Sequence, residues 1–310
     1  MPAADPAFFR RAMTESEKGV LFAVLAHFVW GGMAIYFYAI RHISPVEIAA
    51  SRGLWSLPVA LAVVLVLGQY RDVLAALTRP RILAVLSLTA VLVVFNWGFY
   101  VWSIEVGRAL ESSLGYFINP LLNVVMGYLF LGERFTRPQL VALGLAAAAV
   151  LIQTVAVGVF PWLGLMLAST FCLYGFLRKT VAVGPTQGFF IEVLIAAPLL
   201  LAAQLWLVSR GAAHFGGNAF DTLMLMGCGL LTSGSLILFA ASIRRIRYST
   251  AGLLQYMSPS FVFLTAVFIF HEPIGMAKLF SFVLIWIALA IFSFSSIRDE
   301  RERRRAAQPS

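Results

Sequence analysis

Residues 110–133 read LESSLGYFINPLLNVVMGYLFLGE, and residues 249–272 read STAGLLQYMSPSFVFLTAVFIFHE. In each stretch a proline inside an apolar run is followed thirteen residues later by a glutamate: Pro120 by Glu133, and Pro259 by Glu272. Other apolar positions of this part of the chain also recur 139 residues later, and earlier ones recur at an offset of 140. The chain therefore contains two copies of a unit of about 140 residues, a repeat that is typical of transporters.

The composition indicates that most of the protein surface faces membrane lipid rather than water. Of its 310 residues, 61% are hydrophobic and 12% are charged, and the mean hydropathy is +0.89. A soluble domain carries roughly a quarter charged residues, because its surface must be hydrated. The apolar runs are long and unbroken, which favours membrane helices over the short alternating strands of a barrel.

The net charge of +9 does not indicate a nucleic-acid partner, because the charged residues occur in short groups between apolar runs. Cys172 and Cys228 lie inside apolar runs and are predicted to be small buried hydrophobes rather than a disulfide or a metal site. The polar start of the chain is too charged for a cleavable signal, so the first apolar run is expected to stay in the protein.

The apolar runs predict ten membrane-spanning helices, five in each copy. The predicted organisation is a cytoplasmic segment (1–17), a first five-helix repeat (18–157), a second five-helix repeat (158–297) and a basic cytoplasmic tail (298–310). The predicted spans are 18–40, 45–67, 81–102, 109–131, 137–157, 161–177, 186–208, 220–243, 250–270 and 274–296.

Positive charge predicts how these spans are oriented. Eighteen Lys and Arg residues fall in the two terminal segments and in alternate loops, 4 fall in the other loops, and Arg52 lies inside a span. Cytoplasmic loops collect Lys and Arg, so both termini are expected in the cytoplasm. Because five is odd, the two copies enter the membrane in opposite directions. The predicted fold is an all-α polytopic membrane protein of two inverted repeats, the geometry that supports alternating access.

Polar residues concentrate on the third and fourth predicted spans. Asn96 and Tyr100 share one helix face, and Tyr116 and Asn119 share another with Ser112. Because Pro120 has no N–H to donate to the carbonyl of Tyr116, the fourth span is expected to be kinked. This pattern predicts the wall of a polar cavity. The alternative is interhelical packing, in which such side chains form hydrogen bonds of ~0.6 kcal/mol between helices.

Two charged residues lie deep in predicted spans. Arg52 is seven residues past Pro45, about 11 Å below the outer face. Glu192 lies at a similar depth from the other side. Both must face protein or water. Arg52 is a candidate clamp for a substrate carboxylate, or else it extends outward to the membrane surface. Glu192 and Glu111 are candidates for proton coupling, although neighbouring side chains could instead bind Glu192.

Further candidates come from the repeat and from aromatic positions. Trp30 and Tyr174 occupy matching places in the two copies and could bracket a flat ligand, or simply pack. Gln255 repeats the polar-then-proline arrangement of the fourth span. Glu133 and Glu272 end the fourth and ninth spans and are predicted to be structural or gate-forming, with Arg134 or Arg137 as partners of Glu133. No catalytic motif, phosphate-binding loop or metal-binding pattern occurs, so we expect no enzyme, cofactor or metal, with proton coupling as the open question.

The motifs at 96–102, 111–121, 255–260 and 272–273 resemble those of the EamA-type branch of the drug/metabolite transporter superfamily, and of its RarD subgroup in particular. The resemblance covers residues 18–298. It implies secondary transport of small organic solutes across the bacterial inner membrane, often as export. It also implies a central cavity walled by spans 1, 3, 4, 6, 8 and 9, with Arg52 and Glu192 outside the wall. Carried onto this sequence, the wall includes Trp30, Asn96, Tyr100, Tyr116, Asn119, Tyr174 and Gln255.

Two other functions are compatible with the sequence. One is a flippase of the same architecture for a lipid-linked substrate, which would need a side portal between spans. The other is a membrane partner protein that transports nothing. The expected partners are a small organic solute and the lipid bilayer, without nucleic acid, and the sequence indicates no particular oligomeric state.

Overall fold

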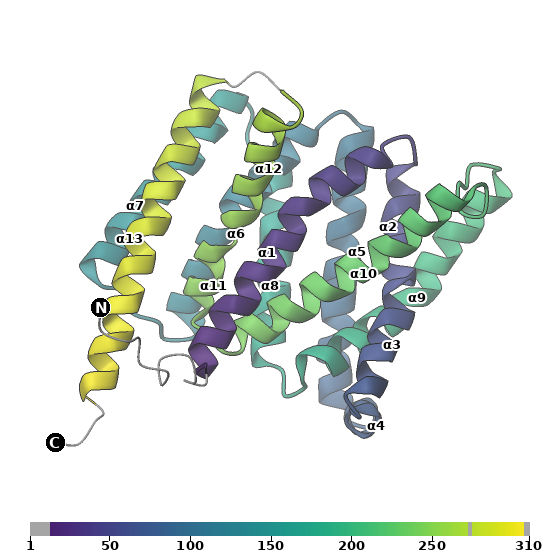
Figure 1. The fold of residues 1–310 in the computed structure, drawn as a ribbon, viewed down its shortest axis with the longest axis horizontal. Helices are drawn as coiled ribbons and strands as arrows, with labels where there is room; N and C mark the ends of the chain where they lie inside the picture. The colour runs from purple at the N-terminus through teal and green to yellow at the C-terminus, as the bar shows by residue number, and fades with distance from the viewer. Residues whose placement is uncertain (1–12, 272–274, 307–310) are drawn as a thin grey trace, which may run out of the picture.

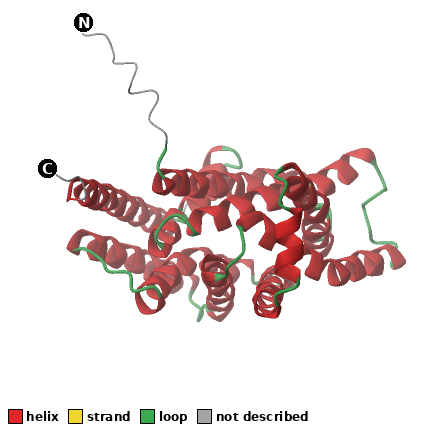
Figure 2. Ribbon diagram, turned by 90° about the horizontal axis from the view of Figure 1, so that it is seen from below, coloured by secondary structure: helices red, strands yellow, loops and turns green. Residues whose placement is uncertain are grey.

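A computed structural model describes residues 13–271 and 275–306 (Figure 1). The described part is helical and contains no strand (Figure 2). Its helices are α1 Glu15–Ala39, α2 Pro45–Leu54, α3 Ser56–Val66, α4 Tyr70–Leu77, α5 Pro80–Glu105, α6 Ala109–Phe130, α7 Arg137–Val157, α8 Trp162–Thr180, α9 Pro185–Ser209, α10 Ala219–Ile243, α11 Tyr248–Leu254, α12 Met257–Phe268 and α13 Met276–Ala306.

Nine segments of the described chain are long and apolar enough to cross a membrane. They are α1, α5, α6, α7, α9, α10 and α13, together with the pairs α2–α3 and α11–α12. The predicted sixth span, 161–177, is helical as α8, but it extends to Thr180 and carries Arg178 and Lys179 in its last turn. These charges leave α8 less apolar than the others. The protein is thus a helical, multi-pass membrane protein.

Two of the predicted spans each consist of two helices, and in both the break lies a few residues before a proline, Pro58 or Pro259. The span 45–67 divides at Trp55, and the span 250–270 divides at Gln255 and Tyr256. Pro259 has no N–H for the carbonyl of Gln255, which accepts from Ser258 N at 3.1 Å instead. By contrast, α6 runs through Pro120 as one helix. The short helix α4 occupies a stretch that the sequence predicted as loop.

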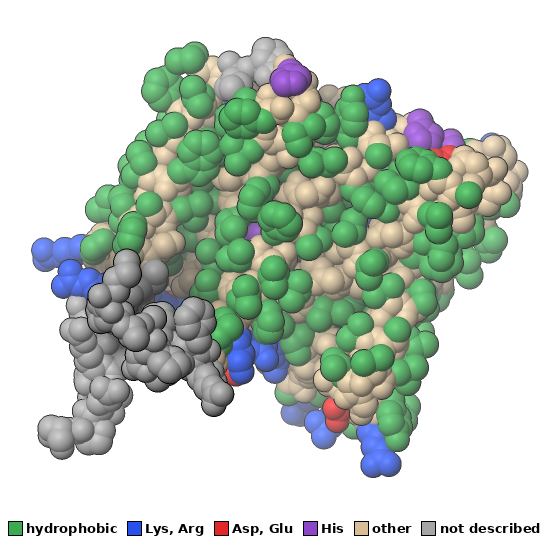
Figure 3. Space-filling view, viewed as in Figure 1, with side chains coloured by type: hydrophobic (Ala, Val, Ile, Leu, Met, Phe, Trp, Pro, Cys, Tyr) green, Lys and Arg blue, Asp and Glu red, His purple; other side chains and the backbone are tan. Residues whose placement is uncertain are grey.

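The helices of the two halves pack against each other throughout the molecule. Helix α1 packs against α10 and α12, α6 against α8 and α11, α9 against α2 and α3, and α7 against α13. Apolar side chains cover much of the face in Figure 3, with Lys and Arg at its lower edge. Cys172 and Cys228 are free and buried, as the sequence predicted.

Glycine allows the closest of these helix contacts, and one such contact can be tested. A Cβ added at Gly229 on α10 would lie 2.3 Å from the backbone carbon of Trp55. We expect Gly229→Ala to destabilise the protein by about 1–3 kcal/mol. Gly234 on the same helix has no described atom within 4 Å of an added Cβ, so Gly234→Ala should be neutral or stabilising by up to about 1 kcal/mol. Unfolding in SDS measures the stability of both purified variants. An equal loss of stability in Gly229→Ala and Gly234→Ala would contradict the close contact between Gly229 and Trp55.

Candidate functional site

Arg52, on α2, is held inside the helix bundle by groups from three other helices. Its Nε donates a hydrogen bond of 3.1 Å to Oγ1 of Thr232, which is close to the middle of α10. Its guanidinium carbon lies 5.1 Å from the ring centroid of Trp97 on α5 and 5.5 Å from that of Phe37 on α1. Such distances allow cation–π attraction. Arg52 therefore does not extend to the membrane surface.

Tyr100 and Tyr116 bring the predicted cavity wall to Arg52. Their rings meet edge to face with centroids 6.2 Å apart, and both phenols interact electrostatically with the Arg52 guanidinium. Tyr116 is 52% exposed. Because the phenol lies within electrostatic range of the Arg52 guanidinium, which other helices hold inside the bundle, we take this exposed surface to face the space between the helices. We call Arg52, Phe37, Trp97, Tyr100, Tyr116 and Thr232 the Arg52 cluster.

Asn119 and Gln255, also predicted for the wall, meet across the two halves of the chain. The Nδ2 atoms of Asn119 and Asn123 each donate to Oε1 of Gln255 at 2.9 Å. Within the described residues, the remaining Oδ1 atoms of both asparagines and Nε2 of Gln255 are buried without a hydrogen-bond partner. Buried polar groups are normally paired. This amide cluster, formed by Asn119, Asn123 and Gln255, can therefore still bind a polar group.

Asn96 and Trp30 contact other helices instead of the Arg52 cluster. Nδ2 of Asn96 donates to the carbonyl of Leu167 and to Oγ1 of Thr170, each at 2.8 Å, which joins α5 to α8. Trp30 packs against the rings of His27, Phe171 and Phe239. These contacts fit the packing alternative for both residues.

Tyr174 and Glu192 lie together in a buried ion-pair cluster. The Glu192 carboxylate accepts from Thr89 Oγ1 at 2.6 Å and from Tyr174 Oη at 3.3 Å, and its Oε1 lies 3.3 Å from Nε of Arg178. The predicted span 161–177 ends just before Arg178, which was therefore expected in a loop, and this is wrong: the residue is 1% exposed in the last turn of α8. The neighbours of Glu192 thus bind it, and proton coupling by this residue stays a prediction.

Glu111 and Glu133 also have partners that fix them in place. Glu111 pairs with Arg108 at 2.5 Å and accepts from the backbone N–H of Leu163 at 3.3 Å. Glu133 accepts from the backbone N–H groups of Tyr248 at 2.5 Å and Ser249 at 3.0 Å, at the start of α11.

The cation nearest to the Glu133 carboxylate in an ion pair is Arg247, at 3.8 Å. The expected partners Arg134 and Arg137 are not paired with it among the described contacts, because α11 presents its free backbone N–H groups there instead. Glu272, its counterpart in the repeat, lies outside the described residues.

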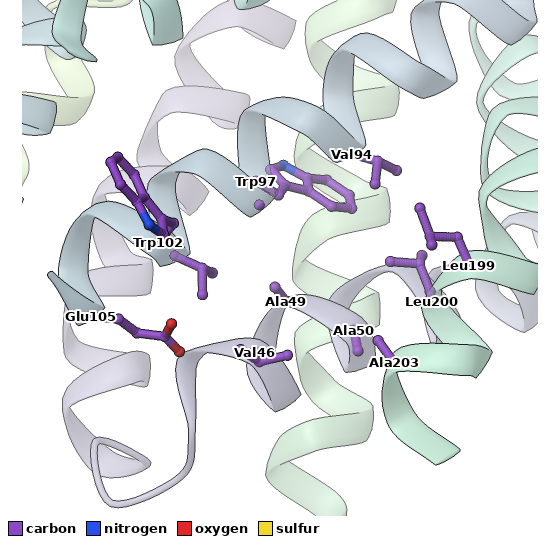
Figure 4. Close-up of a pocket in the computed structure, with 12 residues that line it drawn as sticks. Val46, Ala49, Ala50, Val94, Trp97, Trp102, Glu105, Leu199, Leu200 and Ala203 are labelled. Carbon is purple, nitrogen blue, oxygen red and sulfur yellow. The ribbon is translucent and has the colours of Figure 1, made fainter. Parts of the chain in front are cut away.

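A groove of about 250 Å³ lies beside the Arg52 cluster, between α2, α5 and α9 (Figure 4). Its lining is apolar except for Glu105, which lies toward one end. Trp97 belongs to both features: it lines the groove, and its ring also lies against the Arg52 guanidinium. The side chain of Trp97 therefore separates the groove from the Arg52 cluster.

Five residues of these clusters were not predicted from the sequence as part of a site: Phe37, Thr89, Trp97, Arg178 and Thr232. A signal existed for Thr232, since the run Thr232–Ser233–Gly234–Ser235 interrupts an otherwise apolar helix. Trp97 follows a predicted wall residue directly. Phe37 carries no signal, because one phenylalanine among 26 in an apolar chain is not distinguishable.

A second pair of acids joins the two halves at one end of the molecule. Both carboxylate oxygens of Glu47, at the start of α2, accept from backbone N–H groups of His214 and Phe215 at 2.9 Å. Asp221, in the first turn of α10, lies 2.9 Å from Nε2 of His42. The loop between α9 and α10 is thus fastened to the start of α2, and the loop between α1 and α2 to the start of α10, contacts that the sequence did not predict.

Comparison with known proteins gives consistent matches over nearly the whole chain. The profile of the EamA-like transporter family matches residues 17–155 and 160–294. "Protein RarD" of Salmonella typhi is 38% identical over 93% of this chain and 99% of the relative. An "uncharacterized transporter" of Vibrio cholerae is 39% identical, over 94% and 97%.

A third relative and a solved structure agree with these matches. "Chloramphenicol-sensitive protein RarD" of Pseudomonas aeruginosa is 32% identical over 94% of this chain and 99% of the relative. A crystal structure that is 15% identical in sequence superposes with a TM-score of 0.70, over 90% of this chain and 98% of that one. At that identity the likeness concerns the fold alone.

Proposed function

Because the chain belongs to the EamA-like transporter family and is RarD-like, we propose that it carries small organic solutes across the bacterial inner membrane through a central cavity. The observation that carries this proposal is the Arg52 cluster. It gathers a cation, two phenols and two aromatic faces inside a bundle of membrane helices, where charged groups are rare and usually mark a substrate path. The amide cluster, one turn along α6 from Tyr116, extends the same polar interior.

We further propose that transport works by alternating access between two inverted five-helix repeats, with α8 as the tenth crossing. The packing supports this arrangement. If α1, α5 and α6 correspond to α8, α10 and α11–α12, then the contact of α1 with α10 corresponds to that of α8 with α5. In the same way, the contact of α6 with α8 corresponds to that of α12 with α1. Such exchanged pairs are what a two-fold relation between the two repeats produces, and five crossings in each repeat would put its axis in the membrane plane.

The proposed orientation has both termini in the cytoplasm, and the proposed direction is export. Helix α1 begins and α13 ends at the same edge of the molecule (Figure 1). That edge also carries most of the Lys and Arg side chains visible in Figure 3, as expected of a cytoplasmic face. Export is the direction that the family resemblance implies.

The test of the central cavity is the flux of a solute into vesicles that contain the purified protein. We expect Asn119→Ala to reduce solute flux about tenfold, because it removes one donor of the amide cluster, while the protein still inserts and folds. Ser209→Ala, at the exposed end of α9, is the control and should leave flux unchanged. Unchanged flux in Asn119→Ala would remove the amide cluster from the transport path.

The groove between α2, α5 and α9 favours one second candidate, a flippase for a lipid-linked substrate. Leu199 and Trp102, which line it, are 63% and 40% exposed on the outside of the helix bundle. A substrate with a long chain could keep that chain in the groove while its head group crosses. Faster movement of a lipid-linked solute than of the free solute would favour this candidate.

A further inference from the structure

We infer that the central site binds organic monoanions, in which a carboxylate or similar oxyanion is joined to a flat apolar body, with the Arg52 guanidinium holding the oxyanion. The inference rests on the proposed transport function and names its substrate class. It depends on three features of the Arg52 cluster: an unpaired cation, uncharged neighbours and flanking aromatic rings.

The first feature is that Arg52 has no counter-ion among the described residues. Glu192, Glu111 and Glu47 each have a cationic or histidine partner of their own: Arg178, Arg108 and His214. Glu105 lines the groove that Trp97 separates from the Arg52 cluster, and no described ion pair joins it to Arg52. Burying a charge without a partner is costly, and arginine has five N–H donors. The hydrogen bond that the described structure gives the Arg52 side chain uses only Nε. The two terminal nitrogens are therefore available to an oxyanion in the two-pronged geometry that guanidinium favours.

The second feature is the charge of the surroundings. The described side chains that contact the Arg52 guanidinium group are those of Thr232, Trp97 and Phe37, and none of them carries a charge. The site therefore has the charge of one cation, which an anion with a single charge neutralises. An organic cation would be repelled, and a neutral solute would leave Arg52 unpaired.

The third feature is the shape of the walls. The rings of Trp97 and Phe37 lie near the guanidinium, and those of Tyr100 and Tyr116 meet at an edge-to-face angle of 74°. Aromatic faces on several sides favour a flat apolar group beside the charge. The 52% exposure of Tyr116 provides the opening through which that group can enter.

Three probes that share a benzyl group test the inference: phenylacetate, phenylacetamide and benzylamine. Each is titrated into the purified full-length protein in detergent, and the melting temperature and tryptophan fluorescence are followed. Phenylacetate should raise the melting temperature in a saturable way and bind at least about tenfold more tightly than the other two. Arg52→Gln should weaken phenylacetate binding by ~10- to 100-fold, and Arg52→Lys by less, because it keeps the charge but loses the planar fork.

Arg210→Gln is the matched control, because Arg210 also lies over a tryptophan ring but is exposed at the end of α9; it should bind phenylacetate normally. If Arg52→Gln does not fold, Thr232→Val replaces it, since the loss of the hydroxyl that orients Nε should also weaken phenylacetate binding several-fold. Equal binding of the amide and the carboxylate, or full phenylacetate binding in the tested variant, would overturn the inference.

Flux into vesicles separates the two proposals. Benzenesulfonate serves as the solute because it stays ionised and crosses lipid poorly. If anions bind at Arg52 but benzenesulfonate does not cross, the monoanion site stands and the transport proposal fails. If benzylamine crosses through the protein while no anion binds, transport stands and the monoanion site fails.

Discussion

Replacing Glu192 by glutamine should destabilise the protein by about 3–5 kcal/mol, because it leaves the buried guanidinium of Arg178 without its counter-charge. Both side chains are almost fully buried, at 0% and 1% exposed. The Arg178 side chain has little freedom to move away, since its Nη2 donates to the carbonyl of Pro185 at 2.7 Å and its Nη1 lies against Gly188. Unfolding of the purified protein in SDS measures the loss.

A double variant tests whether the loss comes from the unpaired charge. Glu192→Met combined with Arg178→Met removes both charges, and it should recover most of the stability that Glu192→Gln loses. Glu105→Gln is the control, because Glu105 is an exposed acid; it should change stability by less than about 1 kcal/mol.

The same variant decides between the two roles predicted for Glu192. A proton-coupling carboxylate would tolerate glutamine structurally but would lose flux driven by an imposed pH gradient. If Glu192→Gln is as stable as the parent and loses only pH-driven flux, the structural role is wrong.

The sequence allowed the fold class to be predicted because lipid imposes simple requirements. Long apolar runs and the grouping of charges do not depend on which helix packs against which. The breaks near Trp55 and Gln255 were harder to foresee, since Pro120 presents the same signal and yet α6 continues. A proline leaves the carbonyl four residues before it without a helical N–H donor. Whether the helix is then interrupted depends on which other donors pack beside that carbonyl, and the tertiary structure determines this.

The candidate site was predictable in its chemistry but not in its grouping. Tyr100, Tyr116 and Arg52 were each predicted, but Arg52 was assigned to a helix outside the cavity wall, and the structure brings the three together. Tyr174 was predicted for the wall, and the structure shows its phenol donating a hydrogen bond to Glu192, a partner that the sequence did not indicate. Periodicity places a residue on a helix face, but it does not say which partner that face meets, because one sequence contains no direct record of contacts between helices.

Replacing Glu133 by alanine should loosen the end of the molecule that we propose to be cytoplasmic. Its carboxylate joins the end of α6 to the start of α11 through the backbone N–H groups of Tyr248 and Ser249, and both of these residues are 0% exposed. Each buried N–H left without an acceptor costs about 1–3 kcal/mol, so the variant should lose about 2–6 kcal/mol of stability. Glu15→Ala is the control at the same end, because Glu15 is 65% exposed and pairs only at the surface, and it should cost at most about 1 kcal/mol.

The rate at which a thiol reagent labels buried cysteines distinguishes local opening of this end from unfolding of the whole protein. A cysteine placed at Ser249 is buried in the parent, so a thiol reagent that does not cross membranes should label it slowly. In Glu133→Ala the labelling of Ser249→Cys from the cytoplasmic side should accelerate about tenfold or more, while the buried Cys172 stays unlabelled. Labelling that rises equally at both cysteines would indicate global unfolding instead.

Gly127 provides a way to displace the Glu133 carboxylate without removing it. A Cβ at Gly127 would lie 2.7 Å from Oε2 of Glu133, closer than carbon and oxygen can approach, so Gly127→Ala should push the carboxylate away from α11. Gly144→Ala is the control, because no described atom lies within 4 Å of its added Cβ. If the position of the carboxylate is what holds this end closed, Gly127→Ala should accelerate labelling of Ser249→Cys as Glu133→Ala does, although every charge is retained. If only Glu133→Ala accelerates it, the negative charge beside Arg247 matters more than the two backbone hydrogen bonds, and the end is held by electrostatic attraction.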